Sequence, residues 1–258
     1  MALVEEANTT DALEFVSIDA SSRPQVFQFF HDHPDTTSIV SCIGVLSRDY
    51  HHARAANADT NTNIAAGMCH PKLLPAANKF VYVSSEPYHK HLPFVFNRKI
   101  TLKGYFHGKQ GAEEGITKNL KNRGFILRPG FIYGTRYQSV PSLTTTGGGA
   151  ALAMPLWMIG KPLDLLLSSV GGRKLLAPPC DVEVLAEAAV RACDWAFLGP
   201  EYELTGIADY YRMKEICQRT DPALTQKTQH KEEEMNSETK EEKGVNANKR
   251  ERILFFFI

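Results

Sequence analysis

The sequence predicts an α/β fold, a parallel sheet with helices on both faces. Three short apolar runs, at 38–43, 80–84 and 125–128, have the β-branched and aromatic composition of buried strands. Helical stretches at 51–66 and 104–114 separate them. With 258 residues and 43% hydrophobic content, the chain can build one sizeable domain. We expect the three strands to be adjacent in one sheet.

The N-terminal part predicts a strand followed by a helix. Residues 14–19 have strand composition and end in Asp19. Ser22 is a suitable N-cap, and Pro24 fits the first turn of a helix. The apolar face of that helix would be Val26, Phe29 and Phe30. The strand at 38–43 comes next and is followed directly by Gly44.

The stretch from 80 to 114 contains the candidate catalytic residues. Its strand ends in Ser84 and Ser85, and its helix places Tyr105 and Lys109 one turn apart on the same face. An ammonium beside a phenol favours the phenolate, so Tyr105 can exchange a proton with a carbonyl or an alcohol near neutral pH. A serine at the strand's end can hydrogen-bond the same oxygen. Tyr210 and Lys214 have the same spacing, which we interpret as chance on a solvated helix.

Later segments complete the expected domain. Pro129-Gly130 turns the strand at 125–128 outward, and Arg128 is either a substrate or phosphate contact or the partner of a neighbouring acid. Asp181 is expected to cap a helix, Tyr202–Gly206 to form the last strand, and 208–218 a short helix. The glycine-rich segment 144–149 follows no strand, so we predict a flexible loop there.

The composition changes abruptly near Thr220. A mixed charge run with almost no apolar residues extends to Arg252, which predicts disorder. Six apolar residues, 253–258, end the sequence, and we interpret them as not belonging to the fold. The expected organisation is therefore a lead-in at 1–13, a domain at 14–218 and a disordered charged tail at 219–258.

Several classes of function find no support. The 29 basic and 29 acidic residues balance, so nothing favours a nucleic-acid partner. Five cysteines without a C-x-x-C pair suit a reducing compartment. The histidine pairs lack further ligands at a recognised spacing, so we predict no metal site. No apolar run is long enough to span a bilayer, and we recognise no targeting-peptide pattern.

Five segments in order resemble the short-chain dehydrogenase/reductase superfamily, in its atypical, NAD(P)-binding, NmrA-like branch. They are Val40-Ser41-Cys42-Ile43-Gly44, Tyr82-Val83-Ser84-Ser85, Gly104-Tyr105-Phe106-His107-Gly108-Lys109, Leu127-Arg128-Pro129-Gly130-Phe131-Ile132-Tyr133-Gly134-Thr135-Arg136 and Pro178-Pro179-Cys180-Asp181-Val182. Within this branch the chain is similar to mitochondrial coenzyme Q biosynthesis proteins and plastid relatives, and more distantly to the NAD(P)H-binding accessory subunit of complex I.

The resemblance implies a Rossmann-like fold, NAD or NADP as cofactor, and a role for each matching residue. Tyr105 would be the acid/base, Lys109 its activator and a ribose partner, and Ser84 or Ser85 would orient the substrate. Residues expected near the cofactor are Cys42, Gly44, Lys109, Pro129 and Gly130, with Asp19 either beside the adenine or only leading into a loop. Arg128 would contact substrate, as would Trp157 in a substrate-side cap at 150–175, where ordinary core packing is the alternative.

The resemblance also implies partners and a location. It points to a small-molecule substrate, quinone-like or lipid, with peripheral membrane or respiratory-complex association and no nucleic acid. A mitochondrial location follows from the resemblance alone, with plastid or cytoplasm as alternatives.

The sequence departs from the family at its start. A dinucleotide-binding domain of this kind begins with a strand, a glycine-rich turn and a helix that holds the pyrophosphate. No such segment is present, and residues 14–18 match the family's third strand. Since the usual order is 3-2-1-4-5-6, the first two strands are missing from the sheet's centre. Either the chain is a fragment, or its third and fourth strands pair directly.

Two functions follow from this conflict. Retention of Tyr105 and Lys109 favours an oxidoreductase, whose dinucleotide binding would be weak or absent in this chain. The insert at 86–103 and the absent glycine turn favour a non-catalytic nucleotide-sensing or assembly protein, or an inactive fragment.

Overall fold

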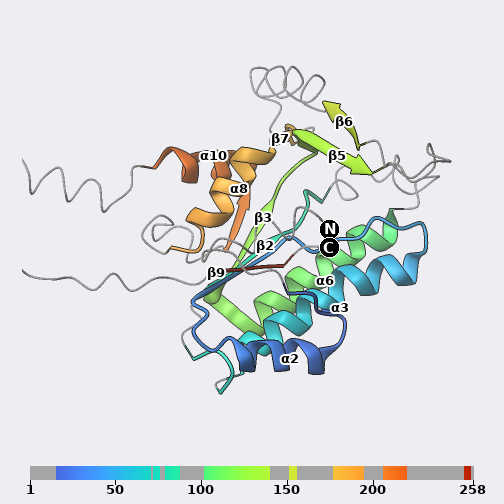
Figure 1. The fold of residues 1–258 in the computed structure, drawn as a ribbon. Coiled ribbons are helices and arrows are strands. Elements are labelled where there is room, and N and C mark those ends of the chain that lie inside the picture. Colours follow the sequence, from blue (N-terminus) through green and yellow to red (C-terminus); the bar gives the residue numbers. More distant parts are fainter. Residues whose placement is uncertain are drawn as a thin grey trace, which may run out of the picture.

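The computed structural model describes residues 16–70, 72–75, 79–87, 102–139, 151–155, 177–194, 206–219 and 253–256, with only the backbone for 135–139, 151–155 and 253–256. A five-stranded sheet in the order β8-β3-β2-β1-β9 forms its centre (Figure 1). Its strands are β1 (Ser38–Ser41), β2 (Lys79–Val83), β3 (Gly124–Arg128), β8 (Ile207–Asp209) and β9 (Ile253–Phe256), and every pair is parallel. The prediction that the first three are adjacent is confirmed.

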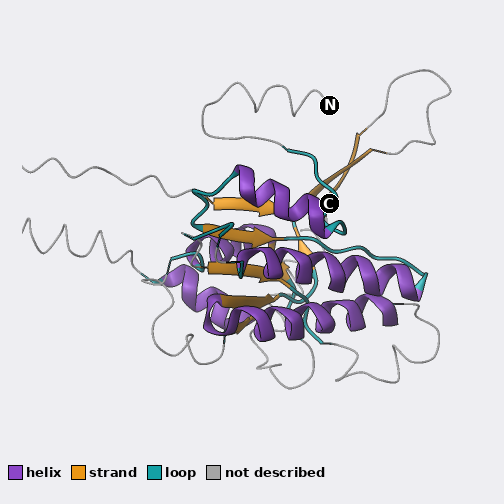
Figure 2. Cartoon of the chain, turned by 90° about the horizontal axis from the view of Figure 1, so that it is seen from below, coloured by secondary structure: helices purple, strands orange, loops and turns teal. Residues whose placement is uncertain are grey.

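Helices cover both faces of the sheet (Figures 1 and 2). On one face lie α2 (Arg23–Asp32), α3 (Tyr50–Met68) and α6 (Lys103–Leu120), and on the other lie α8 (Val182–Arg191) and α10 (Tyr210–Gln218). Alternate residues of β1, β2, β3 and β8 feed two separate cores. On β1, Val40 packs with α8 and α10, while Ile39 packs with α2 and α3. The predicted Rossmann-like α/β class is therefore the observed one.

Shorter elements precede and follow β3. A 3-10 turn at Lys121–Arg123 joins α6 to β3. After β3, β4 (Ile132–Tyr133) pairs in parallel with β7 (Cys180–Asp181). The strands β5 (Thr135–Ser139) and β6 (Ala151–Pro155) form an antiparallel pair.

Local capping follows the sequence closely. Ser22 and Pro24 begin α2 as predicted, although Ser22 makes no side-chain cap bond. Asp181 caps α8 by accepting the Glu183 N–H at 3.0 Å. Asp49 and Asp209 cap α3 and α10 in the same way, each accepting the N–H three residues on.

Two predicted strands differ from the structure. Residues 16–19, the described part of the predicted strand at 14–19, form no strand. The Asp19 carboxylate instead accepts the N–H and the hydroxyl of Ser21, at 2.9 and 2.6 Å, and this local turn leads the chain into α2. Of the predicted strand Tyr202–Gly206 only Gly206 is among the described residues, and it has φ +57°, a left-handed conformation, and lies outside the strand; β8 begins at the next residue, Ile207.

The apolar C-terminal run also differs from our interpretation. Four of its residues form β9, which pairs with β1 in the register Ser38↔Ile253 to Ser41↔Phe256. An uncovered β1 edge would leave backbone N–H and C=O groups unpaired, and an uncharged segment of strand-forming residues can satisfy them. The predictions for 144–149, for the charged run at 220–252, for Trp157 and for most of the 150–175 cap fall outside the described residues.

Glycines bring α3 and α6 unusually close. A Cβ at Gly108 would lie 2.6 Å from the Asn57 Cβ and 2.9 Å from the Arg54 carbonyl oxygen. Backbone cannot move aside as a flexible side chain can, so the contact depends on glycine there. One turn further along, a Cβ at Gly111 would meet only the Ala58 Cβ, at 3.3 Å.

This contrast predicts different effects for two equivalent substitutions. Gly108→Ala should destabilise the protein by about 1–3 kcal/mol because the methyl group forces α3 and α6 apart. Gly111→Ala should change stability by less than about 1 kcal/mol, since the gain in helix propensity offsets a mild contact. Urea denaturation of both variants gives the comparison. Equal losses would show that helix spacing is not what Gly108 provides.

Candidate functional site

The carboxyl ends of parallel strands form the edge at which ligands bind in open α/β sheets. In this chain, α6 carries Tyr105, Lys109 and Glu113 past that edge. Their spacing of four residues puts the three side chains on one face of the helix. The sequence therefore supplies a row of functional groups beside the ends of β1, β2 and β3.

Lys109 lies at the centre of this edge with only 5% of its surface exposed. Its ammonium donates hydrogen bonds to the Val83 carbonyl at 2.8 Å and to the Ile43 carbonyl at 3.1 Å. It also lies 4.8 Å from the centre of the Tyr82 ring and 5.8 Å from that of Tyr105. Burial lowers the pKa of Lys109 to about 8, although Cys42 and Glu113 act in the opposite direction.

Tyr105 is in its protonated form at neutral pH. Burial raises the pKa of this phenol, and the neighbouring Ser85 hydroxyl lowers it by less. This direction is opposite to our expectation that Lys109 would favour the phenolate. The Ser85 hydroxyl is itself buried and makes no well-formed hydrogen bond within the described residues. Tyr105 is therefore poised to donate a proton, with Ser85 beside it.

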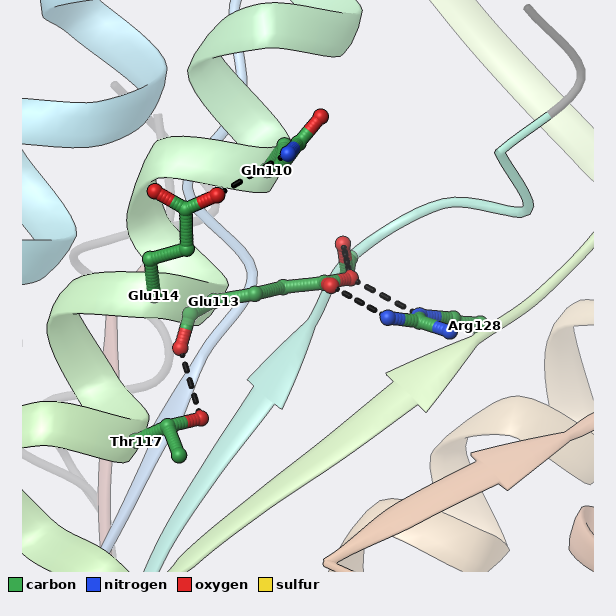
Figure 3. A network of polar contacts seen from close by, with 6 residues as sticks. Gln110, Glu113, Glu114, Thr117 and Arg128 are labelled. Carbon is green, nitrogen blue, oxygen red and sulfur yellow. Dashed lines mark hydrogen bonds and ion pairs between the residues drawn. The ribbon is translucent and has the colours of Figure 1, made fainter. Parts of the chain in front are cut away.

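Glu113 joins α6 to the ends of two strands (Figure 3). Its Oε1 accepts the Ser84 hydroxyl at 2.6 Å and the Arg128 Nε–H at 3.0 Å, while its Oε2 accepts an Nη2–H of Arg128. The side chains of Arg128 and Glu113 are 27% and 13% exposed. Of the two roles left open for Arg128, the structure shows the pairing with a neighbouring acid.

A small pocket lies between these side chains. Its volume is about 20 Å³, room for roughly one water molecule. Eight residues line it: Ser84, Ser85, Pro87, Phe106, Lys109, Gln110, Glu113 and Arg128. Four predicted site residues thus share one pocket, and Tyr105 adjoins it through Ser85 and Lys109.

The segment after β1 forms the other side of the site. A Cβ at Gly44 would lie 2.9 Å from the Lys109 Nζ, so a larger residue there would displace the ammonium. Asn57 on α3 fixes the next residue, donating to the Val45 carbonyl at 2.8 Å and accepting its N–H at 3.2 Å. Cys42 lies nearby, where burial raises the pKa of its thiol and Lys109 lowers it by less.

Other predicted site residues have different positions. Pro129 adjoins the site, since its carbonyl accepts the Glu86 N–H at 2.9 Å, and Gly130 follows it. Asp19 is in an exposed turn, where the nearby Ser21 carbonyl accepts from Asn63 of α3, and none of the Asp19 hydrogen bonds among the described residues reaches the Lys109 cluster. Trp157 lies outside the described residues.

Sequence reasoning missed Glu113 and Asn57. Glu113 follows Lys109 by one helical turn, a spacing that could have identified it. Asn57 carried no comparable signal, because only the folded chain brings it to Val45.

The Tyr210 and Lys214 pair is far from this chemistry. The Lys214 ammonium lies 4.6 Å from the Tyr210 ring centre on α10. Tyr210 is buried in the core on the opposite face of the sheet, so the helix is not simply solvated. The pair remains outside the site, as expected.

Two kinds of feature are absent from the described residues. These residues contain no helix both long and apolar enough to cross a bilayer. Within the same residues, no three or more His, Cys, Asp or Glu side chains are grouped so as to hold a metal ion.

No family model matches the chain. A chloroplast protein of Arabidopsis thaliana, itself uncharacterised, is 28% identical over 218 residues, which are 72% of this chain and 65% of that protein. This chain thus spans less than two thirds of the relative's length.

Among solved structures, WbmH of Bordetella bronchiseptica in complex with NAD⁺ is 17% identical with a TM-score of 0.49, covering 95% of this chain and 71% of its own. A dTDP-4-dehydrorhamnose reductase of Bacillus anthracis in complex with NADP is 18% identical with a TM-score of 0.46, covering 83% and 74%. WbmG of B. bronchiseptica in complex with NAD is 12% identical with a TM-score of 0.46, covering 72% and 55%.

The lowered Lys109 pKa predicts a pH dependence of stability. In the unfolded chain this lysine titrates near its ordinary value of 10.5, so between about pH 8 and 10.5 the unfolded state binds more protons than the folded state. The cost of burying the charge is fully present below pH 8 and is relieved as pH rises through this window. The free energy of unfolding therefore rises by up to about 3 kcal/mol between pH 8 and pH 10.5.

The test compares the wild type with Lys109→Met at pH 7 and pH 10, by urea denaturation. Subtracting the free energy of unfolding of the variant from that of the wild type removes the contribution of other titrating groups that the substitution leaves undisturbed. We expect wild-type stability to rise relative to the variant as pH increases. A constant or falling difference would show that Lys109 is not titrating below its ordinary pKa.

Proposed function

We propose that this chain carries the catalytic half of an NAD(P)-dependent oxidoreductase domain of the short-chain dehydrogenase/reductase type, acting on a carbonyl or an alcohol. One observation carries the proposal: Ser85, Tyr105 and Lys109 converge at the carboxyl ends of β1 and β2. A hydroxyl beside a phenol, with an ammonium 5.8 Å from the ring centre of that phenol, supplies the groups needed to orient a carbonyl oxygen and give it a proton.

The residues fit one end of a dinucleotide. Lys109 has three N–H donors and gives two to carbonyls, so the third remains for a ribose hydroxyl. Gly44 leaves the approach to that ammonium clear of side-chain atoms. At the other end, the described residues include no glycine-rich turn between a strand and a helix for the pyrophosphate. We therefore propose that this chain contacts the ribose end of the dinucleotide through Lys109.

In this mechanism the cofactor, when bound, supplies or takes up the hydride. Ser85 donates a hydrogen bond to the substrate oxygen and holds it against Tyr105. The phenol, protonated at neutral pH, gives its proton to that oxygen as the carbonyl is reduced. The Lys109 ammonium stabilises the phenolate that remains, at 5.8 Å from the ring centre. Ser84 is already committed to Glu113, which favours Ser85 as the orienting residue.

The substrate, partners and location follow from the resemblance. We infer a quinone-like or lipid substrate, met at a membrane surface or in association with a respiratory complex, without nucleic acid. Similarity to a chloroplast protein supports a plastid location, while mitochondrial quinone metabolism rests on the resemblance to coenzyme Q biosynthesis proteins.

A non-catalytic nucleotide-sensing or assembly role is the second candidate. The position of β9 favours it: this strand pairs with β1 on the edge where the resemblance places the family's first strand. A chain that fills this position with an apolar segment lacks the usual route for the pyrophosphate.

Substitution of Tyr105 separates the two candidates. Tyr105→Phe should lower turnover of a quinone or carbonyl substrate by roughly 100-fold or more while leaving NADH and NADPH affinity nearly unchanged, because only the proton donor is lost. Lys109→Ala should weaken both turnover and affinity. Stopped-flow oxidation of NADPH and quenching of its fluorescence measure the two quantities.

Tyr210→Phe is the matched control, since Tyr210 precedes a lysine by the same four residues but lies in the opposite core. Ser85→Ala should lose more turnover than Ser84→Ala if Ser85 holds the substrate. Dinucleotide binding with turnover equal in wild type and Tyr105→Phe would favour the non-catalytic candidate.

A further inference from the structure

We propose that Glu113 is the positioning residue of this site: its carboxylate fixes Ser84 and Arg128 and is the counter-charge of the Lys109 ammonium. The roles of Lys109 and Ser85 in this inference rest on the proposed function. The arrangement of Glu113 itself does not, because it is present in the chain without any ligand.

The first step concerns the hydrogen bonds of Glu113. A carboxylate can accept about four, and this one accepts three from two side chains. The single Ser84 O–H is therefore spent on Glu113 and cannot also serve a substrate. Ser85, the next residue, keeps its hydroxyl for another oxygen. Glu113 thereby decides which of two adjacent serines faces the reaction.

The second step concerns geometry around Lys109. Ser84 directly follows Val83, whose carbonyl accepts the shorter hydrogen bond of the Lys109 ammonium, and the Ser84 N–H donates to the Leu127 carbonyl at 2.8 Å. By holding the Ser84 side chain, Glu113 fixes the peptide that carries this acceptor. A shift of Glu113 would move the end of β2 and the lysine with it.

The third step concerns the charges that face Lys109 from each element. The end of β1 presents Cys42, β2 presents Tyr82, and α6 presents Tyr105 and Glu113. Arg128 at the end of β3 pairs with Glu113, and Glu86 acts on Arg128. Burial raises the pKa values of Cys42, Tyr82 and Tyr105 and keeps all three neutral near pH 7. Glu113 lies one helical turn from Lys109 and lines the same pocket, so it is the carboxylate, among the described residues, that stabilises the ammonium.

The adjacent Glu114 provides a matched control. It is exposed, and its carboxylate accepts a hydrogen bond from Gln110 at 2.9 Å on the outer side of α6 (Figure 3). Thr117 bonds to the backbone carbonyl of Glu113, a contact that a glutamine at 113 would keep. Glu113→Gln and Glu114→Gln are therefore the same chemical change at neighbouring positions with different surroundings.

The experiment follows the titration of Lys109 in the protein without dinucleotide, by NMR of ¹³C-labelled lysine, with the signal assigned from Lys109→Met. The wild-type midpoint is expected at about 8. Glu113→Gln should lower it by a few tenths of a pH unit or more, and Glu114→Gln should leave it in place. Arg128→Gln should raise it, because the Glu113 charge then acts on Lys109 alone. Loosened packing would not move the Lys109 midpoint in opposite directions in Glu113→Gln and Arg128→Gln.

An unchanged midpoint in Glu113→Gln, or shifts of the same sign in Glu113→Gln and Arg128→Gln, would overturn the proposal. If Glu113→Gln does not fold, Arg128→Gln decides, and no rise in its midpoint counts against the role. These readouts use no cofactor and no substrate. A chain that binds no NADPH would therefore refute the proposed function, while the Lys109 midpoints would still decide the role of Glu113.

Discussion

The structure depends on a buried ammonium that joins two strands. Bringing a lysine almost fully out of water costs several kcal/mol, which only close compensation can offset. Carbonyls at the ends of β1 and β2 provide it, together with the face of Tyr82 and the charge of Glu113. Val83 is the last residue of β2 and Ile43 follows the end of β1 at Ser41, so both carbonyls lie at the edge of the sheet. Lys109 and Glu113 between them attach α6 to the ends of three parallel strands.

That attachment requires α6 to approach both the sheet and α3 closely. Gly108 supplies the close approach to α3, and Gly44 does so for the chain leaving β1. Both glycines flank Lys109, one preceding it on α6 and one against its ammonium. Asn57 fills the space between them, bonded to Val45 and to the Ala53 carbonyl on its own helix. Small residues and a satisfied buried amide thus make room for a charge that would otherwise be too costly to bury.

Local pattern was sufficient to predict most of the fold. Strands at 38–43, 80–84 and 125–128 were recognisable because central parallel strands are apolar on both faces, and helix starts were marked by Ser22-Arg23-Pro24 and Asp181. The strand at 14–19 was wrong because an aspartate that can bond its own backbone competes with pairing. β9 was missed because pairing between residues more than 200 positions apart leaves no local trace. Within the site, Tyr105, Lys109 and the serines followed from spacing, whereas the direction of the Tyr105 pKa depends on burial, which spacing does not show.

The position of β9 bears on how the sheet and the site are related. In a doubly wound sheet, the strand beside the fourth strand is the first, and the turn after it holds the phosphates. Here a strand from the far end of the sequence pairs with β1, so the backbone of β1 is satisfied without that turn. The two needs of a dinucleotide domain, a closed sheet and a phosphate turn, are thereby separated. The residues of the proposed catalytic site follow β2 or lie on α6, and the hydrogen bonds of Lys109 and Glu113 that hold them involve no residue of β9. A sheet closed in this way can therefore keep the geometry around Tyr105 without a phosphate turn beside β1, and both proposed functions start from that separation.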